Sequence, residues 1–97
     1  MDTYTLKEST RKDKRYMIVM DGMTHHFGSK NGLTYIDNRN DKYKSSWMAR
    51  HRGDKNFNNP HSGIYYSRHL LWGPTNNFNQ NIKALEKEDN IKIVSFS

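Results

Sequence analysis

The sequence contains no cysteine and only two prolines, and just 33% of its 97 residues are hydrophobic. Without cysteine, a disulfide framework and a cysteine-ligated zinc site are both excluded. The apolar runs are short, so no membrane span is expected. The first residues, Met1 to Glu8, contain no apolar signal core. We therefore expect the chain in the cytosol, in the nucleus or packaged in a particle.

Motifs for catalysis and for metal or cofactor binding are also missing. The chain has no glycine-rich phosphate loop, no Ser-His-Asp set and no cysteine nucleophile. Five histidines are present, but none belongs to a His-Glu-x-x-His motif. His25 and His26 are adjacent in a predicted strand, so their side chains should point to opposite faces of a sheet. We therefore expect no enzyme, no bound metal and no cofactor.

The length suits one domain, and we expect residues 1–97 to fold as a single unit. A mean hydropathy of −1.09 leaves little apolar material for a core in so small a domain. Two tryptophans, six tyrosines and four phenylalanines compensate in part, because each ring can bury roughly 150–250 Å². The expected core is Tyr16, Ile18, Phe27, Trp47, Ile64, Leu71, Trp72, Phe78, Ile82 and Leu85.

The first part of the chain has the pattern of a β-meander. Strands are predicted at 3–8, 16–20 and 23–27, and a last strand at 91–96. Asp21-Gly22 lies between two apolar runs, which is a strong signal for a hairpin with a type I′ turn. The expected fold is α+β, with a small antiparallel sheet formed by the N-terminal meander and the C-terminal strand, and three helices packed on one face.

The three helices are predicted between the third and the last strand. The first spans 40–52 and presents Tyr43, Trp47, Met48 and His51 on one face, with Gly53 as a left-handed cap. Ser62 can cap the second, which ends at Gly73-Pro74 and places Ile64, Arg68, Leu71 and Trp72 on one face. The third is capped within 75–77, buries Phe78, Ile82 and Leu85, and ends at Asn90.

Positive charge is in excess, with a net charge of +6, and it falls in two blocks at 7–15 and 39–55. Such blocks indicate an anionic partner, either nucleic acid or an acidic protein surface. Scattered lysines and arginines that only keep a small protein soluble would give the same composition. The expected contacts with nucleic acid or an anionic surface are Arg11, Lys12, Lys14, Arg15, Lys42, Lys44, Arg50 and Arg52.

Two Arg-His pairs adjoin the tryptophans, Arg50-His51 near Trp47 and Arg68-His69 near Trp72. An arginine could hold a phosphate there while a ring stacks on a base. The same residues could instead stack on one another inside the fold, and this structural interpretation is favoured because aromatic rings are nearly the only core material. The tripeptide 52–54, Arg-Gly-Asp, is read as a helix end.

Several segments together resemble a known family. They are Lys14-Arg15-Tyr16, Asp21-Gly22, His26-Phe27-Gly28, Trp47-Met48-Ala49-Arg50-His51 and Tyr66-Ser67-Arg68-His69-Leu70-Leu71-Trp72. Over roughly Thr5 to Ile93, the chain resembles short basic proteins encoded by large double-stranded DNA viruses, such as iridoviruses and phycodnaviruses. That family carries a histidine where this chain has Asn38, and Asp-Trp where it has Asn56-Phe57, which argues against a catalytic or metal role there.

The resemblance implies a viral origin but no activity. We therefore expect a non-enzymatic structural protein, a small virion or minor capsid component that docks on a larger assembly through basic and aromatic surfaces. Its partners would be other virion proteins, including the major capsid protein, and it would be found in the virion and in the host cytoplasm or nucleus. The alternative is a sequence-nonspecific nucleic-acid-binding protein, and a small nuclease is a more distant one.

Overall fold

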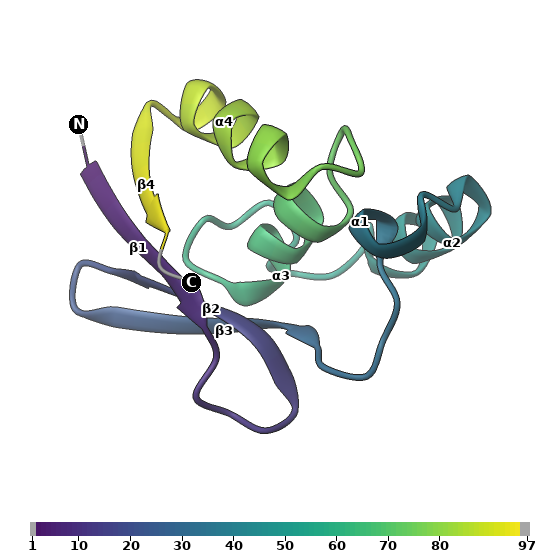
Figure 1. The fold of residues 1–97 in the computed structure, drawn as a ribbon, viewed down its shortest axis with the longest axis horizontal. Helices are drawn as coiled ribbons and strands as arrows, with labels where there is room; N and C mark the ends of the chain where they lie inside the picture. Colours follow the sequence, from purple (N-terminus) through teal and green to yellow (C-terminus); the bar gives the residue numbers. More distant parts are fainter. Residues whose placement is uncertain (1, 96–97) are drawn as a thin grey trace.

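The computed structural model describes residues 2–95, which form a four-stranded sheet with all helices on one of its faces (Figure 1). The elements are β1 (Asp2–Glu8), β2 (Lys14–Met20), β3 (Met23–Ser29), α1 (Tyr35–Asn38), α2 (Asp41–His51), α3 (Gly63–Tyr66), the π-helix η1 (Ser67–Leu71), α4 (Phe78–Asp89) and β4 (Ile91–Ser95). The predicted α+β class is confirmed. No helix among the described residues is long and apolar enough to cross a membrane.

The sheet has the strand order β3-β2-β1-β4. The three N-terminal strands form the predicted antiparallel meander, and the turn between β2 and β3 has positive φ at both Asp21 (47°) and Gly22 (77°), as a type I′ turn requires. The last strand differs from the expectation, because β4 lies parallel to β1, with Tyr4 opposite Ile93. Helix α4 carries the chain back along the sheet before β4 begins, so the sheet is mixed. The sixth predicted residue of this strand, Phe96, lies outside the described residues.

The core lies between the helices and the face of the sheet formed by alternate strand residues. Leu6, Ile18, Met20 and Phe27 point into it and are almost fully buried. Of the predicted core, Ile18, Phe27, Trp47, Leu71, Trp72, Ile82 and Leu85 are buried, while Tyr16, Ile64 and Phe78 are half-buried and pack against it. The sequence reasoning missed Tyr4, Leu6, Met20, Tyr35, Phe57, Tyr65, Tyr66, Leu70, Ile91 and Ile93.

The predicted second helix is interrupted by a π-helical turn. The amide of Trp72 donates to the carbonyl of Ser67, five residues earlier, at 3.0 Å. A π-turn contains more residues than an α-turn, so the spacing of 3.6 residues no longer predicts which side chains share a face. Of the predicted face, Leu71 and Trp72 are buried and Ile64 and Arg68 are half-buried, whereas Tyr66 and Leu70, which that face left out, are fully buried.

The helix ends agree with the sequence in part. Asn77 caps α4 by accepting from the amide of Gln80, and Asn90 ends that helix with a φ of 54°. The predicted left-handed cap at Gly53 is wrong, because α2 ends at His51 with Arg52 as a right-handed cap, and φ of Gly53 is not positive. Ser62 does precede α3, but its hydroxyl donates to loop carbonyls and not to the helix.

Candidate docking surface

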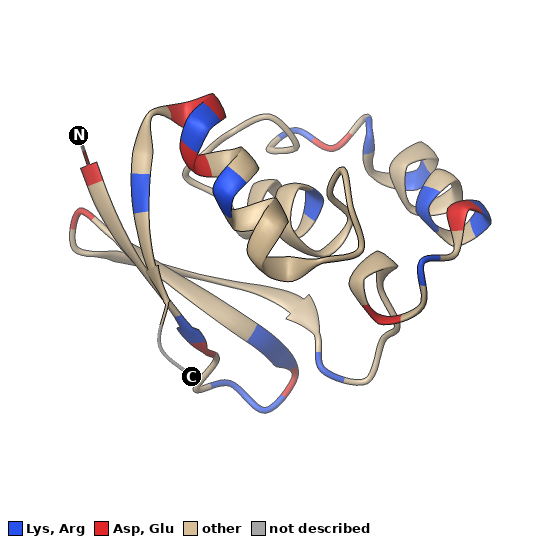
Figure 2. Cartoon of the chain, turned by 45° about the horizontal axis from the view of Figure 1, so that its top comes forward, with Lys and Arg blue, Asp and Glu red and all other residues tan. Residues whose placement is uncertain are grey.

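The eight basic residues predicted as contacts lie in two separate regions and do not form one site. Arg11, Lys12, Lys14 and Arg15 belong to the loop between β1 and β2 and to the start of β2, whereas Lys42, Lys44, Arg50 and Arg52 belong to α2 and its end. Figure 2 shows these regions at different ends of the molecule, with α1 between them. Each region is therefore described on its own.

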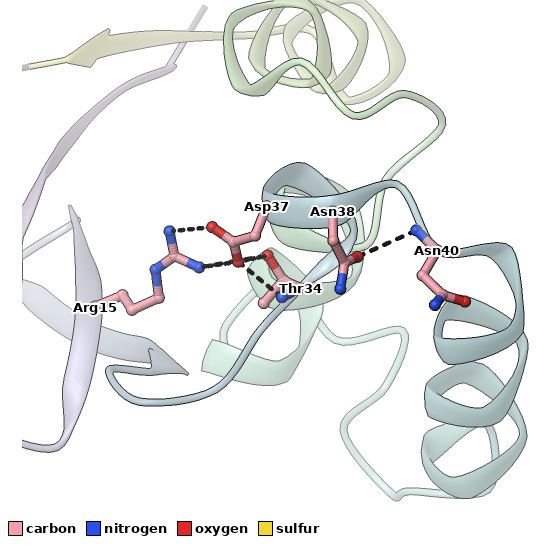
Figure 3. Close-up of polar contacts among 5 residues, drawn as sticks. All are labelled: Arg15, Thr34, Asp37, Asn38 and Asn40. Carbon is pink, nitrogen blue, oxygen red and sulfur yellow. Dashed lines mark hydrogen bonds and ion pairs between the residues drawn. The ribbon is translucent and has the colours of Figure 1, made fainter.

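Arg15 is engaged inside the protein, where it ties β2 to α1 (Figure 3). Its guanidinium donates to both carboxylate oxygens of Asp37, at 2.7 and 3.2 Å, and the amide and hydroxyl of Thr34 donate to the same carboxylate at 2.7 Å each. Burial alone would raise the pKa of Asp37, but the hydrogen bonds from Arg15 and Thr34 outweigh it and hold the pKa below the ordinary value. The arrangement gives Arg15 a structural role.

Asn38 also has a local role in the fold. Its side-chain oxygen accepts from the amide of Asn40 at 3.1 Å (Figure 3). Asn40 in turn caps α2 by accepting from the amides of Lys42 and Tyr43. These asparagines therefore set the turn from which α2 begins.

The other basic residues near β2 lie at the surface. Arg11 pairs with Asp13 at 3.6 Å, but both side chains are more than half exposed, so this ion pair adds little to stability. Lys12 is exposed and Lys14 half-buried, and neither has a hydrogen-bond or ion-pair partner within residues 2–95. Lys12 and Lys14 are therefore two cations whose side chains have no partner within residues 2–95.

Helix α2 lies at the edge of the molecule (Figure 1), and the residue that it buries in the core is Trp47. The ring of Trp47 stacks on that of Trp72 with centroids 5.2 Å apart and an angle of 11°, and it also contacts Phe57. Lys44 adds a hydrogen bond from its ammonium to the carbonyl of Gly73 at 2.6 Å. Most of the helix surface is therefore free to meet a partner.

The outward side of α2 carries two cations and one exposed ring. Lys42, Ser46 and Arg50 are spaced by four residues and so lie on one side of the helix, next to Tyr43. All four are exposed, and 54% of Tyr43 is accessible. The side chains of Lys42 and Arg50 have no hydrogen-bond or ion-pair partner among the residues that the structure describes. We call this surface, Lys42, Tyr43, Ser46 and Arg50, the basic face of α2.

The sequence grouped Tyr43 with Trp47, Met48 and His51 on one face of α2, but Tyr43 is exposed while the other three are buried or half-buried. The helix docks through a narrow surface centred on Trp47, with Lys44, Met48 and His51 half-buried around it. Tyr43 precedes Trp47 by one turn on the same side of the helix, but 54% of it is exposed, and Arg50 follows two turns after Tyr43 on that side. The sequence of α2 contains three basic residues and two serines but few apolar ones. This composition could have indicated that the helix packs on the core through a narrow surface.

The two Arg-His pairs serve the fold to different degrees. The ring of His51 contacts Trp47, and its Nδ1 lies 2.8 Å from the carboxylate of Asp54, so the tripeptide 52–54 closes the helix end. The guanidinium of Arg68 lies 4.6 Å from the ring centre of Phe57 and donates to the side chain of Asn58. His51 and Arg68 therefore make the contacts within the fold that the structural interpretation expects, whereas Arg50 is exposed.

The histidines do not gather into a metal site. Within residues 2–95, no three His, Asp or Glu side chains come together in a way that could hold a metal ion. His25 lies opposite Ile18 and His26 opposite Met17, so the two histidines face opposite sides of the sheet, as predicted. The Nε2 atom of His25 is buried and has no hydrogen-bond partner.

Acidification is expected to destabilise the fold through His25. Burial, and after it the charge of nearby His61, lowers the pKa of His25 below its ordinary value. The unfolded chain therefore takes up this proton first, and stability falls as the pH drops below about 6.5. Thermal unfolding is measured at about pH 7.5 and about pH 5.5, on either side of the ordinary pKa of histidine. The drop in Tm between these two pH values should be smaller in His25→Gln than in the parent. An equal loss in both proteins would contradict this role.

Comparison with known proteins gives one match. Residues 4–51, from β1 to the end of α2, match the sequence model of a family described as "Family of unknown function (DUF5754)". No curated protein and no solved structure matches the chain. The matched part contains seven of the eight predicted contact residues, all except Arg52, and the basic face of α2. The chain is therefore similar in this part to a family without a known function, and its viral origin stays a prediction.

Proposed function

We propose that this chain is a non-enzymatic structural protein, a small virion or minor capsid component, that docks on the anionic surface of a larger assembly through α2. The observation that supports the proposal most directly is the basic face of α2. Lys42 and Arg50 are exposed and have no partner within residues 2–95, next to an exposed tyrosine. Cations with a neighbouring aromatic ring are well suited to a charged protein interface, where tyrosine and arginine are enriched.

The distribution of aromatic rings limits which residues can take part in docking. Most of the rings form the core, so a broad aromatic surface is not available, and Tyr43 is the ring on α2 that a partner can reach. Interfaces owe most of their binding energy to a few such anchors, surrounded by groups that exclude water. The proposal therefore places the contact on one helix face, with other virion proteins as the partners.

Sequence-nonspecific binding of nucleic acid is the second candidate, because the same unpaired cations could contact phosphates. It makes a different prediction about salt. Binding to duplex DNA releases counterions, so log affinity falls linearly with log salt by about 0.9 for each phosphate contacted. Docking on a protein surface with a tyrosine anchor depends less steeply on salt.

A gel-shift titration with random duplex DNA across salt concentrations separates the two candidates. We expect binding weaker than about 1 μM near physiological salt, and the same duplex should remain uncut in the presence of magnesium or manganese, since no paired acid, base and nucleophile is available. Peptides of the chain are expected in the shell fraction of purified virus particles. Submicromolar binding with a steep salt slope would overturn the proposal in favour of nucleic acid.

The variants for these assays replace the cations of the basic face of α2. The double variant Lys42→Gln/Arg50→Gln should weaken whatever docking is seen, because it removes both cations of the basic face of α2. The matched control is Lys83→Gln/Lys87→Gln on α4, which removes the same charge from two exposed lysines without a partner in the described chain. If both double variants weaken docking equally, net charge and not this helix face is responsible.

A further inference from the structure

A groove of about 280 Å³ runs between α2, η1 and α4, on a different side of α2 from its basic face. We call it the cationic groove. Its walls include Lys44, Met48, Arg68, Trp72, Pro74 and Glu88. Lys44 and Met48 come from α2, Arg68 and Trp72 from η1 and its end, and Glu88 from α4, so three elements that are distant in sequence build it.

The two cations of this groove are held in place by neutral groups. The ammonium of Lys44 donates to the carbonyl of Gly73 and lies 4.5 Å from the ring centre of Tyr35. The guanidinium of Arg68 lies over the ring of Phe57 and donates to an amide oxygen. Both side chains are half-buried, yet neither pairs with a carboxylate within residues 2–95.

This arrangement differs from that of Arg15, whose guanidinium is paired with both oxygens of Asp37. Ordering a partly buried cation without a counter-charge is unfavourable, and an anion brought by a ligand would relieve it. Because carbonyl and ring contacts already fix the positions of Lys44 and Arg68, a ligand would not need to order them. The groove thus has the properties of a prepared anion site.

The lining of the groove also includes apolar side chains. Met48, Trp72 and Pro74 contribute them, and methionine adapts readily to a ligand of varied shape. Glu88 is the acidic residue of the groove, and 65% of its side chain is exposed. Its carboxylate lies 3.8 Å from Nδ1 of His69, whose pKa burial lowers, so this histidine adds little positive charge near neutral pH.

From this complementarity we infer that the cationic groove binds an acidic peptide segment of a partner protein. A carboxylate of the segment would contact Lys44 and Arg68, and a neighbouring apolar side chain would cover Met48, Trp72 and Pro74. A nucleic-acid strand fits less well, because it needs a row of cations along its backbone, and the lining of this groove provides Lys44 and Arg68. The inference rests on the proposed docking function and names the chemistry of the partner.

The test is a titration of the ¹⁵N-labelled protein, followed by NMR, with a peptide of alternating glutamate and leucine. The matched control peptide has glutamine in place of glutamate. We expect the acidic peptide alone to shift the amides of Met48, His69 and Gly73 and the indole N–H of Trp72. Equal shifts with both peptides, no shift in this group, or larger shifts with a single-stranded oligonucleotide would overturn the inference.

Charge variants test the assignment of residues. Lys44→Gln and Arg68→Gln should each weaken binding by about threefold or more, the effect of losing a partly exposed ion pair. Both residues also support the fold, so the decisive variant is Glu88→Gln on the exposed rim, which should tighten binding of the acidic peptide by about twofold. Its matched control is Asp21→Asn at the distant β2–β3 turn, a position with positive φ that asparagine tolerates. Unchanged binding in Glu88→Gln, or tightening in both variants alike, would contradict the inference.

The proposal for the groove and the proposal for the basic face of α2 can be contradicted independently. The double variant Lys42→Gln/Arg50→Gln changes the basic face alone and should leave peptide binding in the groove unchanged. Loss of partner docking in that variant, with the groove still binding peptide, supports both proposals. Peptide binding without any effect of that variant on docking supports the groove and removes the proposed role of the basic face.

Discussion

Replacing Asn81 by leucine is expected to lower the free energy of unfolding by roughly 3 kcal/mol or more. Asn81 is fully buried in α4, and its amide joins this helix to the end of η1 and the loop after it. The amide nitrogen donates to the carbonyls of Leu70 and Thr75, at 3.0 and 2.9 Å. The amide oxygen accepts from the backbone and the hydroxyl of Thr75, at 3.1 and 2.8 Å.

Leucine has nearly the same volume but cannot replace any of these bonds. The polar groups of Leu70 and Thr75 would remain largely out of reach of water, and each buried group left without a partner costs about 1–3 kcal/mol. The carbonyl of Leu70 is at the end of a helix, where the helix itself offers no donor. Gly73 packs against the same amide so closely that a methyl group there would lie 2.9 Å from the Asn81 side chain, so the loop has no room to rearrange.

Thermal and denaturant unfolding followed by circular dichroism measure the effect. A loss of 3 kcal/mol corresponds to a drop in Tm of more than about 10 °C for a domain of this size. The matched control is Asn79→Leu, because Asn79 lies on the same helix but is exposed. If both variants melt within a few degrees of the parent, the buried amide is not the connection that the structure indicates.

The sequence predicted those parts of the fold that depend on local signals. Asp21-Gly22 specifies its turn through two positive φ values, and Asn90 ends α4 for the same reason. The direction of β4 could not be predicted in this way, because the apolar residues Ile91 and Ile93 would alternate equally well in a parallel or an antiparallel strand. Only the path of α4 across the sheet decides it.

The π-helical turn explains the core residues that were missed in the predicted second helix. Residues such as Tyr66 and Leu70 are buried because one turn of the helix holds an extra residue, and no local pattern announces such a turn. Asn81 stabilises the chain just beyond that turn. A polar residue in the middle of an amphipathic helix is normally assigned to the surface, so its role becomes visible only in three dimensions.

The candidate contacts were predicted from charge alone, and charge cannot say which cations the fold itself uses. Arg15 pairs with Asp37, 22 residues away in sequence, and Lys44 reaches the carbonyl of Gly73, 29 residues away. Such partners are invisible to a count of basic residues. The structure leaves Lys42 and Arg50 free within its described part, and it places the exposed ring of Tyr43 beside them.

Trp72→Ala is expected to cost roughly 3–5 kcal/mol, the usual effect of removing a large buried ring. Only 8% of Trp72 is exposed, and its ring fills the space between η1 and α2 by stacking on Trp47. A marginally stable domain has about 5–15 kcal/mol in total, so this loss should leave a substantially unfolded population on mild heating. The control is Tyr43→Ala, which truncates an aromatic residue that is 54% exposed and should change Tm by only a few degrees.

Comparing Trp47→Ala with Trp72→Ala distinguishes local unfolding of α2 from destabilisation of the whole core. Trp47 reaches the core from α2, whereas Trp72 follows η1 directly and adjoins the buried leucines of that helix. Amide exchange in Trp47→Ala should therefore accelerate mainly in α2, while in Trp72→Ala it should accelerate throughout the sheet and α4 as well. A Trp72→Ala protein that melts like the parent would show that the indole serves a partner. In that event Trp72 would contribute to the lining of the cationic groove and not to the stability of the core.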